Sequence, residues 1–281
     1  MQACRWQPSP LAFDTKQKTP YQYLAMRAIF SALLIITYLA ITSLIFGLKG
    51  IHSRAQTFDW LLTSALGIST ETSNGPQIPA SGRHLIISNH PGFIDGFVLT
   101  QWAIRQGVLH RIRFIVAEWV GKLPLPGFGE HHFIKVKRQW TEDKPALEAA
   151  IRQLPEDAIV FIFPEGTTFC PGSLEKTVDY ARKHHLPVFN YLMCPRVRGL
   201  ELLLQVGKWD AIYDMTIHYP QRAANPFSGS DFEYMLWGNY PRSATIEWRK
   251  LRHIPIGNIQ KWLLHLWERK DLRLRLALRR V

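Results

Sequence analysis

The stretch HLIISNHPGFIDGF, residues 84–97, joins an apolar run to a histidine, a Pro-Gly pair and an aspartate. Residues 85–88 read LIIS, which is typical of a buried strand. The Pro-Gly pair predicts a turn, and the residues from Ile94 onward predict a helix. His90 would then lie at the carboxyl end of a strand and Asp95 in the first helical turn, where α/β folds gather ligands.

The spacing of His90 and Asp95 allows their side chains to meet. A carboxylate that holds Nδ1–H fixes the tautomer of an imidazole and leaves the other nitrogen free as a general base near neutral pH. The pattern H-x4-D is short, however, and it also fits a structural histidine that caps a turn.

A second stretch, AIVFIFPEGTTF at residues 158–169, repeats the arrangement of an apolar strand that ends abruptly in polar residues. Glu165 supplies a carboxylate, Gly166 permits close approach of a ligand to the backbone, and Thr167 supplies a hydroxyl. Two such strand ends in one sheet would face one cleft.

Outward from these stretches, short β-rich runs alternate with helix-like runs. This alternation predicts an α/β fold with a mixed, largely parallel sheet flanked by helices. The Pro-, Gly- and Ser-rich residues 219–243 predict a long loop. The predicted strands are residues 85–88, 112–117, 133–136, 158–163, 188–193, 211–218 and 244–249, and the predicted helices are residues 94–105, 143–153, 173–184 and 259–279.

Residues 28–48, AIFSALLIITYLAITSLIFGL, contain no charged side chain. This run is long enough to cross a hydrocarbon core of about 30 Å as a helix, so we expect an N-terminal membrane helix that either spans the bilayer or re-enters from one leaflet. Residues 57–68 predict a short amphipathic helix and residues 69–82 a polar linker. The main domain would then begin near Arg83.

The charge of the chain points to an anionic partner, since the formal net charge is +12 at pH 7. No recognised nucleic-acid motif accompanies it, which favours an anionic lipid surface or a phosphorylated substrate. The three cysteines, Cys4, Cys170 and Cys194, lack C-x-x-C spacing, so neither a disulfide framework nor a zinc ribbon is predicted. The histidine pairs at 131–132 and 184–185 are adjacent rather than four residues apart, and no metal site is expected.

The two strand-end motifs, NHPGFID at residues 89–95 and FPEGT at residues 163–167, resemble the first and third blocks of the PlsC-type glycerolipid acyltransferase superfamily. Residues 186–204, 211–220 and 262–274 resemble the branch that contains lysocardiolipin and lysophosphatidylinositol acyltransferases and their bacterial inner-membrane relatives. The resemblance runs from about Arg83 to the end of the sequence.

This resemblance implies a glycerol-3-phosphate acyltransferase-like fold and transfer of an acyl group to the free hydroxyl of a lysophospholipid. The donor would be acyl-CoA or acyl carrier protein as co-substrate, with no further cofactor. His90 would act as general base, oriented by Asp95, and Glu165, Gly166 and Thr167 would bind the glycerol-phosphate end of the acceptor. Backbone N–H groups near His90 or Gly166 are candidates for the oxyanion hole.

The second block is the poorest match, because residues 114–138 carry Val136 where relatives show arginine. Lys135, Lys137 and Arg138 either replace it as phosphate ligands or form a solvated basic edge. Arg196, in the segment CPRVRG, is a candidate for an anionic headgroup, or it forms a surface salt bridge.

The expected organisation is a tail at residues 1–27, the membrane helix at 28–48, the amphipathic segment and linker at 49–82, and the acyltransferase domain with a basic C-terminal helix at 83–281. The active site would face the cytoplasm at a bacterial-type inner membrane, and residues from Arg275 onward would approach anionic lipid. Two alternatives stay open: an inactive membrane scaffold, and an acyl-thioester hydrolase. The sequence does not determine the oligomeric state or the headgroup.

Overall fold

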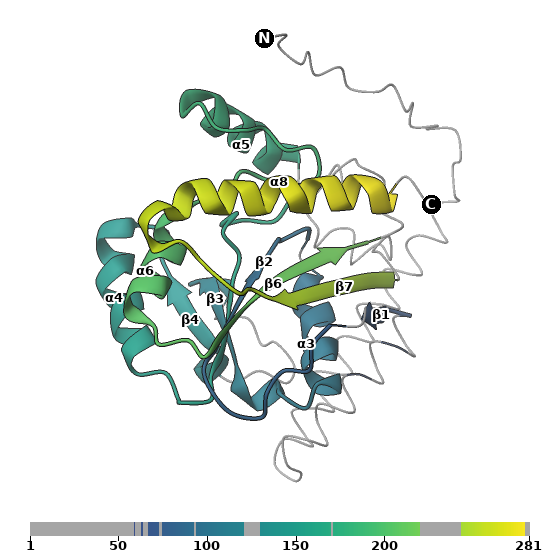
Figure 1. Cartoon of the computed structure of the whole chain (residues 1–281), viewed down its shortest axis with the longest axis vertical. Helices are drawn as coiled ribbons and strands as arrows, with labels where there is room; N and C mark the ends of the chain where they lie inside the picture. Colours follow the sequence, from purple (N-terminus) through teal and green to yellow (C-terminus); the bar gives the residue numbers. More distant parts are fainter. Residues whose placement is uncertain are drawn as a thin grey trace.

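The computed structural model describes residues 59, 63, 67–72, 75–92, 94–120, 130–169, 171–219 and 243–278 of the 281-residue chain (Figure 1). Its strands are β1 Ser69–Thr72, β2 His84–Ser88, β3 Ile112–Ala117, β4 Phe133–Val136, β5 Ile159–Ile162, β6 Ala211–His218 and β7 Ser243–Lys250. Its α-helices are α3 Asp95–Arg105, α4 Trp140–Arg152, α5 Pro171–Lys183, α6 Arg198–Val206 and α8 Ile259–Leu278, and its 3-10 turns are Leu109–Arg111, Glu130–His132 and Ile256–Asn258.

The described strands form one seven-stranded mixed sheet in the order β1-β7-β6-β2-β5-β3-β4. β2 lies in its middle and pairs in parallel with both β5 and β6, so that Leu85 is opposite Val160 on one side and Ile212 on the other. β3 and β4 continue the parallel arrangement, whereas β7 runs antiparallel to β6. The carboxyl ends of five parallel strands therefore meet at one edge of the sheet.

The sheet is covered on both faces, which is why its central strands are apolar throughout. Side chains alternate along β2, so that Ile86 joins the core under α3 while Leu85 and Ile87 join the core on the opposite face. α3 packs Trp102 against Phe161 and Trp248 in the first core. The second core contains the apolar sides of α4, α6 and α8. Figure 1 shows α8 crossing the sheet near the edge where the parallel strands have their carboxyl ends.

The α/β sheet predicted from the sequence is confirmed, and three predicted strands (112–117, 133–136 and 211–218) have the observed bounds. The strand predicted at residues 188–193 is wrong, because these residues pair with no strand. Asp271 instead accepts hydrogen bonds from the N–H groups of Asn190 and Tyr191. Among the described strands and α-helices, two were not predicted: α6, and β1 within the segment interpreted as linker.

Several predicted segments lie outside the described residues. These are the membrane helix at 28–48, most of the amphipathic segment at 57–68, and residues 220–242 of the long loop. Within the described ranges, no helix combines the length and the apolar character needed to cross a membrane.

Candidate active site

The His90 imidazole and the Asp95 carboxylate are in contact, as their spacing predicted. His90 Nδ1 lies 2.7 Å from Asp95 Oδ2. The carboxylate is fully buried, whereas 23 % of the His90 side chain is exposed. Among the described residues no hydrogen bond involves His90 Nε2, so this nitrogen is available to a ligand.

Asp95 is held by two further donors. The backbone N–H of Gly92 donates to Oδ2 at 3.0 Å, and the hydroxyl of Tyr219 donates to Oδ1. Tyr219 directly follows β6, the strand next to β2, which brings it to the same edge of the sheet. With both oxygens occupied, the carboxylate has a fixed orientation toward the imidazole.

The loop that carries His90 is pinned on both sides. The Asn89 side chain exchanges two hydrogen bonds with the backbone of Ile217 in β6, at 2.8 and 2.9 Å. On the other side Phe163, which follows β5, stacks on the His90 ring with the ring centroids 4.4 Å apart. The position of the imidazole is therefore set by the strands on both sides of β2.

Glu165 lies beneath the His90 loop and is only 3 % exposed. Its Oε2 accepts the backbone N–H of His90 at 3.3 Å, and its Oε1 accepts the indole N–H of Trp267 at 3.2 Å. Burial raises the pKa of Glu165 to about 8, although both hydrogen bonds and the nearby Lys270 act in the opposite direction. The carboxyl group is thus largely neutral at pH 7.

Gly166 and Arg196 lie beside each other. Gly166 has φ +72°, a left-handed conformation in which a side chain would be strained. The Arg196 Cδ lies 3.9 Å from the place that a β-carbon on Gly166 would occupy, and the Arg196 N–H donates to Pro164 O at 2.7 Å. The exposed guanidinium extends over the Tyr180 ring, 5.6 Å from its centroid. Thr167, next in the chain, is partly exposed.

The basic residues of the second block are not brought to His90. They lie in or just after β4, three strand spacings from β2, which is about 14 Å. Lys135 is paired with Glu130 and Lys137 with Glu142, both at 2.8 Å, and Arg138 is exposed. This arrangement fits the interpretation of these residues as a solvated basic edge.

The sequence placed the candidate oxyanion hole among the backbone N–H groups near His90 or Gly166, and the N–H groups of these two residues already have acceptors. That of His90 donates to Glu165, and that of Gly166 donates to Phe163 O at 2.9 Å. Neither is free for a substrate oxygen in this conformation.

Sequence reasoning missed three residues of the site: Phe163, Tyr219 and Trp267. A usable signal existed for the first two, because Phe163 ends one predicted strand, Tyr219 directly follows another, and parallel strands end together. Trp267 lies in the middle of α8, and the local pattern holds no comparable signal.

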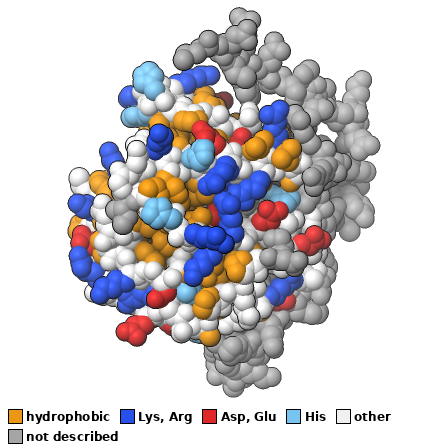
Figure 2. Space-filling view, in the orientation of Figure 1, with side chains coloured by type: hydrophobic (Ala, Val, Ile, Leu, Met, Phe, Trp, Pro, Cys, Tyr) orange, Lys and Arg blue, Asp and Glu red, His pale blue; other side chains and the backbone are white. Residues whose placement is uncertain are grey.

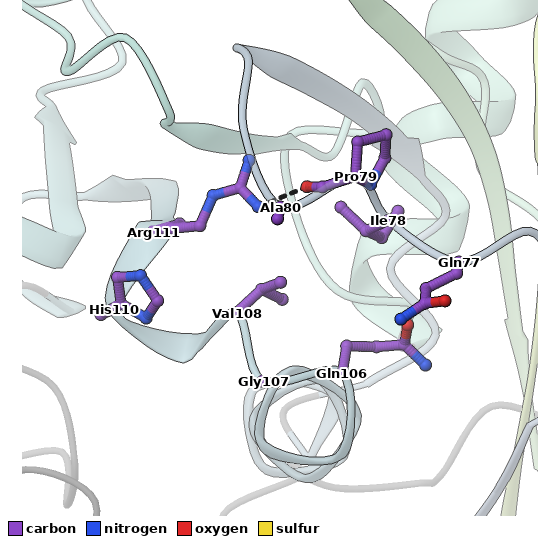
Figure 3. Close-up of a pocket in the computed structure, with 9 residues that line it drawn as sticks. All are labelled: Gln77, Ile78, Pro79, Ala80, Gln106, Gly107, Val108, His110 and Arg111. Atoms are coloured by element: carbon purple, nitrogen blue, oxygen red, sulfur yellow. Dashed lines mark hydrogen bonds between the residues drawn. The ribbon is translucent and has the colours of Figure 1, made fainter.

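A separate cavity of about 480 Å³ opens at the opposite edge of the sheet (Figure 3). It is lined by residues 77–80, which lead into β2, and by residues 106–108, 110 and 111, which lead into β3. Figure 3 shows the Arg111 guanidinium donating to Pro79 O, at 2.6 Å, and it also donates to Gly82 O and Asp157 O. This arginine is therefore satisfied by the fold, and the cavity is remote from His90.

Comparison with known proteins agrees with this geometry. Residues 70–189 match the family model named Acyltransferase. The chain is 30% identical over 209 residues to "Probable 1-acyl-sn-glycerol-3-phosphate acyltransferase 5" of Arabidopsis thaliana, a match that covers 70% of this chain and 54% of that protein. It is 27% identical over 230 residues to "Lysocardiolipin acyltransferase 1" of Gallus gallus, which covers 76% of this chain and 59% of that protein. The chain thus spans little more than half the length of these relatives.

The fold also matches a solved structure. The 1-acyl-sn-glycerophosphate acyltransferase PlsC from Thermotoga maritima superposes with a TM-score of 0.52 at 14% identity, covering 90% of this chain and 95% of that one. At this identity the match establishes the fold alone. The resemblance seen in the sequence is confirmed: residues 70–189 form a domain of the Acyltransferase family.

Proposed function

We propose that this protein is a lysophospholipid acyltransferase, which moves a fatty acyl group from acyl-CoA or acyl carrier protein to the free hydroxyl of a lysophospholipid. The observation that carries the proposal is the His90–Asp95 contact, in which a partly exposed imidazole meets a buried carboxylate held by two other donors. The Acyltransferase domain and the names of the relatives support the reaction class.

In the proposed reaction, His90 Nε2 removes the proton of the acceptor hydroxyl as its oxygen attacks the thioester carbonyl carbon. Asp95 stabilises the imidazolium that forms. The carbon–sulfur bond then breaks, and the leaving thiolate takes the proton from His90. Acyl transfer is complete without a covalent enzyme intermediate.

The anionic end of the acceptor would lie beside Gly166, Thr167 and Arg196. Gly166 has no side chain to block close approach, and the neighbouring guanidinium is exposed and carries a fixed positive charge. A guanidinium matches the geometry of a phosphate oxygen pair. The headgroup would thus be recognised next to the reacting hydroxyl.

We also place the protein at an anionic membrane, with the active site on the cytoplasmic side. The acceptor and product are membrane lipids, and the net charge of +12 favours an anionic surface. Figure 2 shows Lys and Arg side chains gathered near the centre of the visible face, beside hydrophobic ones.

The test is acyl transfer by the purified full chain in nanodiscs, with labelled acyl-CoA or acyl carrier protein and a panel of lysolipids. His90→Ala should lower the rate about 100-fold or more, because general base catalysis typically contributes that much. His110→Ala is the matched control, since this exposed histidine lies at the opposite edge of the sheet and should leave the rate unchanged.

Two outcomes would contradict the proposal. Consumption of the thioester without an acylated lipid would identify a hydrolase. Absence of transfer from either donor to every lysolipid, with folded protein, would favour the membrane scaffold.

A further inference from the structure

The helix α8 reaches the candidate active site through Trp267. This side chain is fully buried, and its indole N–H donates to Glu165 Oε1 at 3.2 Å. Lys270, one turn further along, lies over the indole ring with Nζ 5.0 Å from the centroid. The indole is therefore held between a carboxyl group and a cation.

Lys270 is itself fixed to the sheet. Its buried Nζ lies 2.9 Å from Asp214 Oδ1 and donates to Met215 O in β6. Asp214 also pairs with Arg249 and Arg273. Breaking a buried ion pair is costly, so the contact between Lys270 and Asp214 fixes the position of α8, and with it Trp267, relative to β6.

Glu165 is almost closed to a substrate in this conformation. Both oxygens accept N–H groups of the protein, and the residue is nearly inaccessible. The charged groups that face it are Lys270 and Asp95. A ligand that used this carboxyl group would have to displace His90 or Trp267.

The second oxygen of Glu165 connects Trp267 to the base. It accepts the backbone N–H of His90, and the carbonyl of His90 accepts the N–H of Phe169 at 3.0 Å. The loop after β5 thus holds both backbone polar groups of His90. Any movement of Glu165 would move the backbone from which the imidazole extends.

We propose that Trp267 is a positioning residue for His90: it holds Glu165, and Glu165 holds the backbone of the base, so that Glu165 serves the base rather than the acceptor lipid. This inference rests on the proposed acyltransferase function. It changes the role implied for Glu165 and gives α8 a part in the reaction.

The first test compares Trp267→Phe with Trp262→Phe. The phenylalanine at 267 removes the N–H donor and keeps an aromatic ring beside Lys270, while Trp262 is a half-buried indole of the same helix that packs in the second core. We expect Trp267→Phe to lower kcat about tenfold with KM for the lysolipid unchanged within about twofold, since an interaction that shapes the transition state is lost. Trp262→Phe should change neither constant.

A raised KM with unchanged kcat would overturn the inference, because Glu165 and Trp267 would then serve acceptor binding. Unchanged kcat and KM would overturn it as well. The double variant Glu165→Gln, Trp267→Phe should have the kcat of Glu165→Gln alone, because both changes break one chain of contacts. If the fold-losses in kcat of the two single variants multiply in the double variant, the two residues act separately.

A measurement without substrate separates this inference from the proposed function. With the 11 histidines labelled with ¹⁵N, the His90 amide signal is assigned by its loss in His90→Ala. Trp267→Phe should shift this signal, whereas Trp262→Phe should not, and an unmoved signal would contradict the inference.

If the wild-type protein transfers no acyl group, the proposed function alone fails. If Trp267→Phe does not fold, the kcat and KM of Glu165→Gln decide, with a raised KM again contradicting the inference.

Discussion

At the scale of single residues, Asp95 interacts with three donors from two parts of the chain. His90 and Gly92 belong to the loop between β2 and α3, and Tyr219 directly follows β6. The turn alone would leave one carboxylate oxygen without a donor. The hydroxyl of Tyr219 completes the set in a buried environment, where an unpaired oxygen is costly.

Tyr219→Phe should therefore lower kcat by about 10- to 150-fold, because loss of a hydrogen bond to a charged group costs about 1.5–3 kcal/mol. The acyl transfer assay measures it, together with the pH dependence of kcat. Tyr213→Phe is the matched control, since this tyrosine lies in β6, the strand that Tyr219 follows, and its ring packs on His84, away from the site. Wild-type kcat in Tyr219→Phe would show that Asp95 needs no third donor.

The sequence predicted the residues that belong to local motifs. His90, Asp95 and Gly166 each follow or begin an element whose pattern is visible within about fifteen residues. Tyr219 and Trp267 could not be assigned in this way, because their partners Asp95 and Glu165 are distant in sequence. Such contacts depend on strand order and helix packing, which periodicity does not specify.

At the scale of elements, one turn of α8 fastens three segments of the site. Trp267 holds Glu165, Lys270 holds β6 through Asp214, and Asp271 accepts the N–H groups of Asn190 and Tyr191. The last contact stabilises the extended segment that leads to Arg196. Residues 188–193 are apolar enough for a strand but pair with none of the described strands, and two of their N–H groups, those of Asn190 and Tyr191, bind a helix side chain instead.

Asp214→Asn should destabilise the fold by about 3–5 kcal/mol, the usual cost of leaving one buried partner of an ion pair uncompensated. Burial lowers the pKa of Lys270, and Asp214 is the partner that keeps its charged form favourable. Denaturant unfolding measures the change. The double variant Asp214→Asn, Lys270→Met should recover part of the loss, and equal stability of Asp214→Asn and wild type would contradict the importance of this pair.

β1 is the reverse case, a strand that the sequence did not predict. Its residues, STET, are mostly polar and exposed, so they resemble a linker, yet they pair in parallel with β7 at the border of the sheet. Thr70 is the buried residue of the strand, and its hydroxyl bonds Gln101 of α3. Edge strands depend on such tertiary contacts more than on propensity.

At the scale of the whole molecule, the buried carboxyl group of Glu165 links stability to pH. The folded protein keeps this proton up to about pH 8, whereas the unfolded chain releases it near 4.5. Between these values the folded state binds more protons, so stability falls as pH rises. The contribution is complete below pH 4.5 and is lost as pH passes 8.

The wild-type protein should therefore lose stability relative to Glu165→Gln between about pH 5 and pH 8, by about 1.4 kcal/mol per pH unit at most. Melting temperatures of the two proteins over this range measure the difference, and the uncharged glutamine is the reference. A constant difference would show that Glu165 is ionised in the folded state throughout.

The dependence of the site on α8 has a consequence for synthesis on the ribosome. His90, Asp95 and Glu165 are translated well before Trp267, and nascent domains begin to fold from the segments that emerge first. A chain that has emerged only as far as β6 holds its base and carboxylate but lacks the indole and the cation that fix Glu165. The proposed chemistry would therefore reach its full rate only late in translation, after most of the sheet has formed.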